Sequence, residues 1–224
     1  MAPVSQTFEL SPFSAVDLRA LGELKIEVAE AGAAPTLVIE TSEAILPKLR
    51  SDVKDGRLVL TFDLTWWEWG TWWFSWIRLP DRKVKYTLRA TGLDEVGLTG
   101  SGTVSADSLT ADHLTLRITG SGKIRVGALE AAQLKVRVSG SGDLSLAGRV
   151  GQQEISISGS GKVEAADLES ERTKIQISGS GTTKVKATQE LAVKINGSGR
   201  VFYQGEPQTI TQRVSGSGRI DKLG

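Results

Sequence analysis

The chain has 224 residues, 39% of them hydrophobic, with 27 basic and 26 acidic residues and a net charge of +1. Such a chain can bury a full core. Its interspersed charges, without a basic block that contains aromatic residues, give no reason to expect nucleic-acid binding. It has no cysteine and one histidine, His113, which we expect on the surface beside Asp112. Disulfides, thiolate metal sites and Cys or His nucleophiles are therefore excluded or nearly so, and no cofactor is expected.

The first 95 residues begin without a basic start followed by an apolar run, so no secretory signal or membrane span is visible, although a removed signal would leave the same pattern. A short helix is expected at Ser42 to Leu49, where Ser42 is placed to cap the first turn and Pro47 keeps the helix brief. Asp55-Gly56 predicts a turn before the strand at Leu58. Alternating apolar and polar residues predict short strands near Phe8, Leu10 and Phe13 and at 15–18, 24–28, 37–39, 58–62 and 84–88.

All six tryptophans fall within residues 66–76, together with one phenylalanine: Trp66, Trp67, Trp69, Trp72, Trp73, Phe74 and Trp76. A strand pattern enters this segment, another leaves it and Gly70 lies near its middle, which favours a projecting hairpin tip. A hairpin cannot bury six indoles by itself. Three interpretations stay open: the tip caps the apolar end of the fold, makes a subunit contact, or meets a lipid headgroup boundary or sugar rings.

The tripeptide Gly-Ser-Gly occurs seven times after residue 99, at steps of 20, 20, 19, 20, 18 and 19 residues. A fixed period of this length is typical of a solenoid, in which each coil buries its apolar face against its neighbours. Apolar residues, many of them β-branched, stand at alternate positions on both sides of each tripeptide, which predicts at least two strands per coil. The glycine pairs leave no stretch long enough for a packed repeat helix. Successive coils are therefore expected to pair as parallel strands.

The tripeptide has a structural explanation as a corner where stacked coils approach closely. Its central serines are expected to form a structural ladder, and the sequence leaves open whether their side chains point into or out of the rod. These serines are Ser101, Ser121, Ser141, Ser160, Ser180, Ser198 and Ser217.

Enzymatic, calcium-binding and ice-binding solenoids are less well supported. The acids that could cleave a polysaccharide lie at different offsets from their tripeptides, so we expect no paired-carboxylate site and no catalytic residue. The residue after each tripeptide is more often basic than acidic, which disfavours calcium. A regular threonine ladder, which an ice-binding face needs, is missing. The acids considered are Asp107, Asp112, Asp143, Glu164 and Asp167.

The chain resembles the bacterial head GIN domain family, the putative auto-transporter adhesin head domains, over nearly its whole length. The resemblance implies a right-handed parallel β-helix that is exported or displayed outside the cytoplasm, a similarity to domains of envelope-stress membrane proteins, and no catalytic residues to carry over. The tryptophan-rich segment departs from the family pattern. The resemblance is carried by Phe13–Val16, Leu24–Val28, Leu37–Ile39, Asp55–Leu60, Lys85–Leu88 and Leu93–Gly102.

We therefore expect an all-β protein, a right-handed parallel β-helix with about 18–20 residues per coil. Residues 1–95 form its N-terminal β section with the hairpin insertion at 66–76, and residues 96–224 form the Gly-Ser-Gly solenoid, in one continuous domain. The expected function is that of a non-enzymatic, adhesin-like module of the bacterial surface or envelope that forms a homo-oligomer through the tryptophan-rich tip. The alternative is docking of the tip on a membrane surface or glycan in envelope-stress sensing, and a carbohydrate-active enzyme is less favoured.

Overall fold

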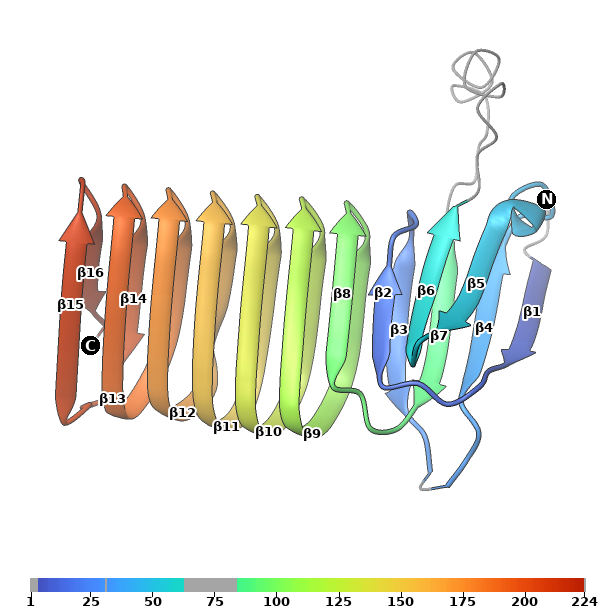
Figure 1. The fold of residues 1–224 in the computed structure, drawn as a ribbon, viewed down its shortest axis with the longest axis horizontal. Coiled ribbons are helices and arrows are strands. Elements are labelled where there is room, and N and C mark those ends of the chain that lie inside the picture. Colours follow the sequence, from blue (N-terminus) through green and yellow to red (C-terminus); the bar gives the residue numbers. More distant parts are fainter. Residues whose placement is uncertain (1–3, 31, 63–83, 224) are drawn as a thin grey trace, which may run out of the picture.

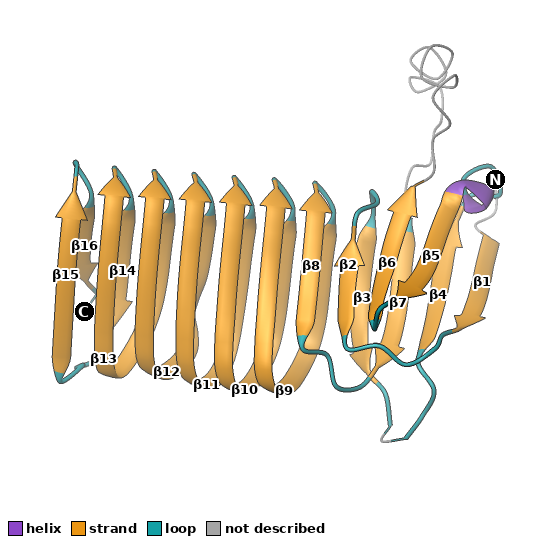
Figure 2. Cartoon of the chain, viewed as in Figure 1, coloured by secondary structure: helices purple, strands orange, loops and turns teal. Residues whose placement is uncertain are grey.

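A computed structural model describes residues 4–30, 32–62 and 84–223. These residues form a flat rod of two stacked β-layers in which the strands lie across the long axis (Figures 1 and 2). The predicted parallel β-solenoid is confirmed: neighbouring coils pair as parallel strands from β2 and β3 to the C-terminal end of the rod.

Five coils of the repeat region are each a single long strand that bends once. The strand descends one layer, turns at the lower edge of Figure 1 and ascends the other layer to end at the next Gly-Ser-Gly corner. Corresponding positions of successive coils stack in register, as Val104 does on Ile124 and Leu116 on Val136. The long strands are β9 (Thr103–Gly120), β10 (Lys123–Gly140), β11 (Asp143–Gly159), β12 (Lys162–Gly179) and β13 (Thr182–Gly197).

The two layers are named here after one strand of each. The β8 face contains β5 (Leu49–Lys54), β6 (Arg57–Phe62), β2 (Ala15–Leu18), β8 (Glu95–Gly100), the second halves of β9 to β13, and β15 (Thr209–Ser215). The β3 face contains β1 (Val4–Glu9), β4 (Thr36–Thr41), β7 (Lys85–Ala90), β3 (Glu23–Val28), the first halves of β9 to β13, β14 (Arg200–Gln204) and β16 (Arg219–Lys222).

The N-terminal section does not stack in chain order. Strand β2 lies between β6 and β8, and β3 lies between β7 and β9, so the coil made by β2 and β3 is inserted between strands that follow it in sequence. The end of the rod is built from antiparallel pairs, β1 with β4, β4 with β7 and β5 with β6. Antiparallel neighbours need only short connections, which lets the chain cover this end with its own strands.

The helix expected at Ser42 to Leu49 is wrong in its extent. Only a 3-10 turn forms, η1 (Leu46–Lys48), and Leu49 already begins β5. The carbonyl of Ser42, rather than its side chain, accepts the first hydrogen bonds, at 2.9 Å from the amide of Ile45. The sequence analysis did not predict β5, which is a strand because it pairs along its length with β6. The Asp55-Gly56 turn between them is confirmed, with φ values of 51° and 70°.

The core is one continuous column of aliphatic side chains between the layers. The predicted apolar rows beside each corner are buried, for example Ile118, Ile155 and Ile195, each 0% exposed. Val214 in the last coil is the exception at 45% exposed, because no further coil covers it among the described residues. Sheet stacking thus explains the periodicity of the sequence.

A polar cluster interrupts the core where the coil lengths change. Gln153 donates hydrogen bonds from Nε2 to Ser170 Oγ at 2.8 Å and to Thr173 Oγ1 at 3.0 Å, and Ser170 donates to the carbonyl of Lys186 at 2.9 Å. All three side chains are buried. The register between β12 and β13 shifts on both sides of Ser170. The hydrogen bonds therefore satisfy the amide nitrogen of Gln153 and the two hydroxyls where the coils differ in length, whereas Gln153 Oε1 is buried without a partner among the described residues.

Candidate interaction surfaces

The Gly-Ser-Gly corners form the upper edge of the rod in Figure 1. The first glycine of each corner has a φ between 108° and 124°, which residues with side chains rarely adopt. A Cβ at Gly140 would also lie 2.6 Å from the carbonyl oxygen of Gly120 in the preceding coil. A Cβ at Gly142 would lie 2.4 Å from Ile118 Cγ2. Glycine at 140 and 142 therefore leaves room for the close approach of stacked coils, without any ligand.

The seven corner serines are exposed, so their side chains face out of the rod. The hydrogen bonds between corners run through backbone groups: the amide of Ser141 donates to the carbonyl of Gly120 at 2.9 Å, and the amide of Asp143 donates to the carbonyl of Gly122 at 3.0 Å. This pattern repeats at the following corners. A ladder through the serine hydroxyls stays a prediction.

The tryptophan-rich segment belongs to a connection that starts and ends at this same edge. Strand β6 runs parallel to β2 and ends at Phe62, and the chain is next described at Val84, directly before β7. The amide of Glu23 donates to the carbonyl of Val84 at 2.9 Å, and the carbonyl of Gly22 accepts from the amide of Thr103 at 3.0 Å, so Val84 lies in the row of corners. The chain therefore leaves the described rod at Phe62 and returns to it at Val84, both at the edge of the corners. Trp66, Trp67, Trp69, Trp72, Trp73, Phe74 and Trp76 lie outside the described residues, and their role stays a prediction.

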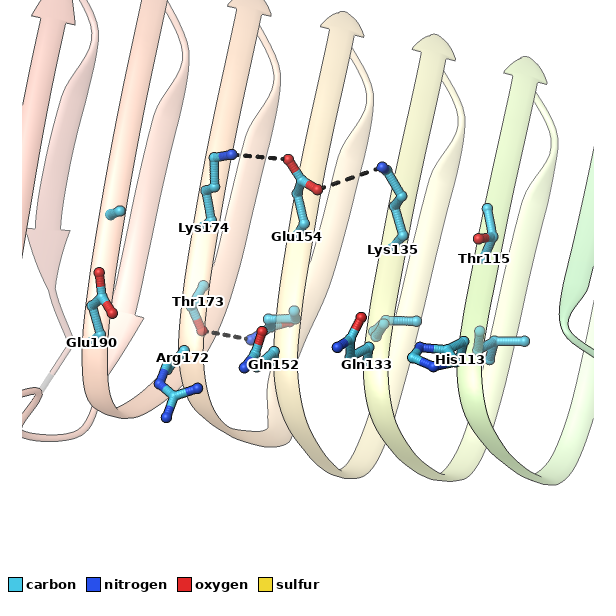
Figure 3. A pocket seen from close by; sticks show the side chains of 14 residues that line it. His113, Thr115, Gln133, Lys135, Gln152, Glu154, Arg172, Thr173, Lys174 and Glu190 are labelled. Carbon is cyan, nitrogen blue, oxygen red and sulfur yellow. Dashed lines mark hydrogen bonds and ion pairs between the residues drawn. The ribbon is translucent and has the colours of Figure 1, made fainter.

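A shallow depression of about 420 Å³ lies on the lower part of the β8 face (Figure 3). Its central feature is Glu154, which pairs with Lys174 at 3.2 Å and with Lys135 at 3.6 Å across three coils. The hydrogen bond from Lys174 is the main cause that holds the pKa of the Glu154 carboxyl below its usual value. His113 is exposed at the end of the depression, as expected. These ion pairs join coils and leave no free carboxylate pair in this depression.

Three of the acids considered as catalytic candidates pair with lysines. Asp107 pairs with Lys25 at 3.3 Å, and Asp143 pairs with Lys123 at 3.2 Å, both on the β3 face. Glu164 pairs with Lys162 at 2.6 Å and with Lys184 at 3.3 Å. Asp112 lies at the lower bend, and Asp167 aligns with Ala147 near the same edge. Within the described ranges, no group of three His, Cys, Asp or Glu side chains is placed to hold a metal ion.

An ion-pair network that was not predicted from the sequence lies on the β8 face. Glu95 accepts from Arg57 at 2.7 Å and also contacts Arg117, so one carboxylate joins residues from β6, β8 and β9. The hydrogen bond from Arg57 is the main cause that lowers the pKa of Glu95. Aligning the repeats would have placed Glu95 beside Thr115 and near Arg117, but only the inserted β2 coil brings Arg57 within reach.

The fold and its corners define a class, the parallel β-solenoids that turn at glycine-containing corners. The chain belongs to the bacterial family described as "Putative auto-transporter adhesin, head GIN domain", whose model matches residues 12–207. This confirms the resemblance seen in the sequence. No protein with curated information matches the chain.

Several solved structures share the fold. A putative adhesin from Bacteroides fragilis has a TM-score of 0.86 at 23% identity, with 99% of this chain and 97% of that chain covered. A putative lipid binding protein from Parabacteroides distasonis has a TM-score of 0.77 at 21% identity, with 100% and 97% covered. A putative adhesin from Parabacteroides merdae has a TM-score of 0.73 at 20% identity, with 100% and 97% covered. At these identities the likeness concerns the fold alone.

Membership of this family makes the chain adhesin-like and indicates an extracytoplasmic or surface location. Across the part of the chain that the structure describes, no helix combines the length and apolar character needed to span a membrane.

Proposed function

We propose that the chain is a non-enzymatic interaction module of the bacterial surface or envelope, and that it self-associates through the tryptophan-rich segment at residues 66–76. The observation that supports the proposal is the position of the residues that flank this segment: Phe62 and Val84 both lie at the edge of the corners, and residues 63–83 connect them. The family description, which names an adhesin, supports the general part of the proposal.

A corner does not need a long connection. Gly100, Ser101 and Gly102 suffice to join β8 to β9, whereas residues 63–83 join β6 to β7 at the same edge. Connections of more than about 12–15 residues are uncommon in compact domains unless they serve a function. Tryptophan is enriched in the buried anchors of protein interfaces, and six of them here favour association over solvent exposure.

The contacts of the described acids support a non-enzymatic role. Asp107, Asp143 and Glu164 each form an ion pair with a lysine, and Asp107 shares Lys25 with Glu27. Their contacts are those of ion pairs between and within coils.

The decisive experiment compares the solution mass of the intact chain with that of the Trp72→Ser, Trp73→Ser, Trp76→Ser variant. Light scattering after size exclusion measures the mass, and circular dichroism checks that both proteins are folded. We expect the intact chain to be an oligomer and the variant a folded monomer. A Leu21→Ser, Val28→Ser variant is the matched control, because these side chains are also apolar and exposed, at 47% and 59%, and lie outside the segment. It should remain an oligomer.

A monomeric intact chain would contradict self-association. The second candidate would then be docking of the same segment on a membrane surface or glycan. It is favoured by the name of one structural relative, the putative lipid binding protein from Parabacteroides distasonis. Indole rings with one polar N–H suit a lipid headgroup boundary. Binding to liposomes or sugar that the triple variant has lost would support that candidate.

A further inference from the structure

The upper part of the β8 face carries a second depression, of about 600 Å³, that crosses four coils. Its lining includes two arginines and a series of serines, and the structure shows no carboxylate among its lining residues. We call it the arginine–serine groove and define it by Arg117, Arg137, Ser139, Ser156, Ser158 and Ser178. It lies on the Gly-Ser-Gly coils.

The two arginines are neighbours in register on β9 and β10. Like charges directly opposite each other in a sheet are destabilising. Arg117 is compensated by its ion pair with Glu95. Arg137 is exposed, its other neighbour in register is Ser156, and it makes no ion pair with a residue that the structure describes. The fold therefore places an uncompensated guanidinium beside a second one without an internal partner for it.

The serines continue this positive site along the rod. Ser139, Ser158 and Ser178 stack in one register row, with exposed side chains on successive coils. Stacked strands are about 4.8 Å apart, so the row repeats a hydroxyl at a constant interval. A hydroxyl both donates and accepts hydrogen bonds, as the hydroxyls of a sugar do. Guanidinium groups bind carboxylate and sulfate groups in a bidentate manner.

We propose that the arginine–serine groove binds a linear acidic polysaccharide, with Arg137 and Arg117 on its carboxylate or sulfate groups and the serine row on its hydroxyls. Single-stranded nucleic acid is less suitable, because binding without base readout relies on aromatic side chains for stacking and the groove has none. A membrane surface is less suitable because the apolar residues of the lining, such as Ile118 and Ile157, are buried.

The lower depression differs in a way that supports this assignment. There, Lys135 and Lys174 are both engaged by Glu154, and Glu190 also lines the surface. A polyanion would have to displace these ion pairs or approach the acids. The groove above it offers cations and hydroxyls without that competition.

The test is the affinity of the intact chain for polygalacturonate and for heparin, measured by isothermal titration calorimetry at low and moderate salt, with neutral dextran as the reference. We expect at least one acidic polymer to bind, dextran not to bind, and the affinity to fall with salt. The Arg137→Gln variant should weaken binding by about tenfold or more, as expected for the loss of a hydrogen bond between charged groups. The Ser158→Glu variant, which adds a carboxylate to the groove, should weaken it similarly.

Two control variants use the opposite face of the same strands. Arg125 lies on β10 and Ser145 on β11, both exposed on the β3 face. Arg125→Gln and Ser145→Glu change the net charge by the same amounts as the groove variants, so they should leave the affinity nearly unchanged. Circular dichroism of all four variants would confirm that the fold is kept.

The proposal is overturned if neither acidic polymer binds, or if the β3-face controls weaken binding as much as the groove variants do. Equal binding of single-stranded DNA or of vesicles with anionic lipids, with the same dependence on Arg137, would also overturn the assignment to a polysaccharide. These outcomes are independent of the tryptophan-rich segment. The Trp72, Trp73, Trp76 variant should bind the polymer as a folded protein, so either proposal can fail without the other.

Discussion

Replacing Gly140 by alanine tests whether the corners are set by stacking or only by the backbone conformation of each glycine. The new Cβ would lie 2.6 Å from the carbonyl oxygen of Gly120, far closer than the ordinary contact of 3.4–4 Å. Gly100 provides the matched control. Its φ of 108° is close to the 112° of Gly140, but a Cβ there would meet nothing within 4 Å.

Both variants place an alanine at positive φ, a sparsely populated backbone conformation that costs about 1–3 kcal/mol. This cost is the same for the two variants. Only Gly140→Ala also forces two coils apart. That movement lengthens the hydrogen bond that the amide of Ser141 donates to Gly120, now 2.9 Å. Overpacking costs about 1–3 kcal/mol and a weakened hydrogen bond about 0.5–1.5 kcal/mol. We therefore expect Gly140→Ala to lower the free energy of unfolding by about 2–4 kcal/mol more than Gly100→Ala does.

Urea unfolding followed by far-ultraviolet circular dichroism measures the difference. The slope of the transition should be inspected for both variants, since a solenoid can unfold in parts and a changed slope would signal partial unfolding. If the two alanine variants lose the same stability, contact between stacked corners is not what requires glycine, and the corner would have to be explained by backbone conformation alone.

Two further substitutions test interactions inside the rod. Glu95→Gln should lower the free energy of unfolding by about 1–3 kcal/mol at pH 7, because hydrogen bonds to charged groups are lost. Since the pKa of Glu95 is lowered in the folded state, this difference in stability should shrink as the pH falls below the ordinary carboxyl pKa of about 4.3. A difference that persists in acid would contradict the ion-pair explanation. Thr183→Val should raise the urea midpoint by the equivalent of about 1 kcal/mol, because the Thr183 hydroxyl is buried without a hydrogen-bond partner in a row otherwise filled by apolar side chains. The neighbouring Thr182→Val, on the outer side of the same strand, should bring no such gain, and a loss of stability in Thr183→Val would show that the hydroxyl is satisfied after all.

The periodic half of the chain could be predicted closely. The apolar residues that alternate beside Gly-Ser-Gly are the ones that the structure buries. In a solenoid each position stacks on the same position of the next coil, so a pattern that repeats in the sequence also specifies the contacts between coils. Even Thr183, which breaks the apolar row, is buried as its place in the repeat requires. The outward direction of the serines was open in the sequence, since a small polar residue between two glycines fits either side of a corner.

The remaining features depend on contacts between segments far apart in sequence. No local signal places β2 between β6 and β8, and that insertion is what brings Arg57 to Glu95. Strand β5 forms because β6 offers it an edge, although its sequence begins within an expected helix. That Arg137 has no acidic neighbour follows from its register, which places it between Arg117 and Ser156. The repeating solenoid can therefore be derived from the sequence, because its contacts follow a fixed period. The N-terminal end and the surface sites depend on the three-dimensional fold, because their partners follow no period.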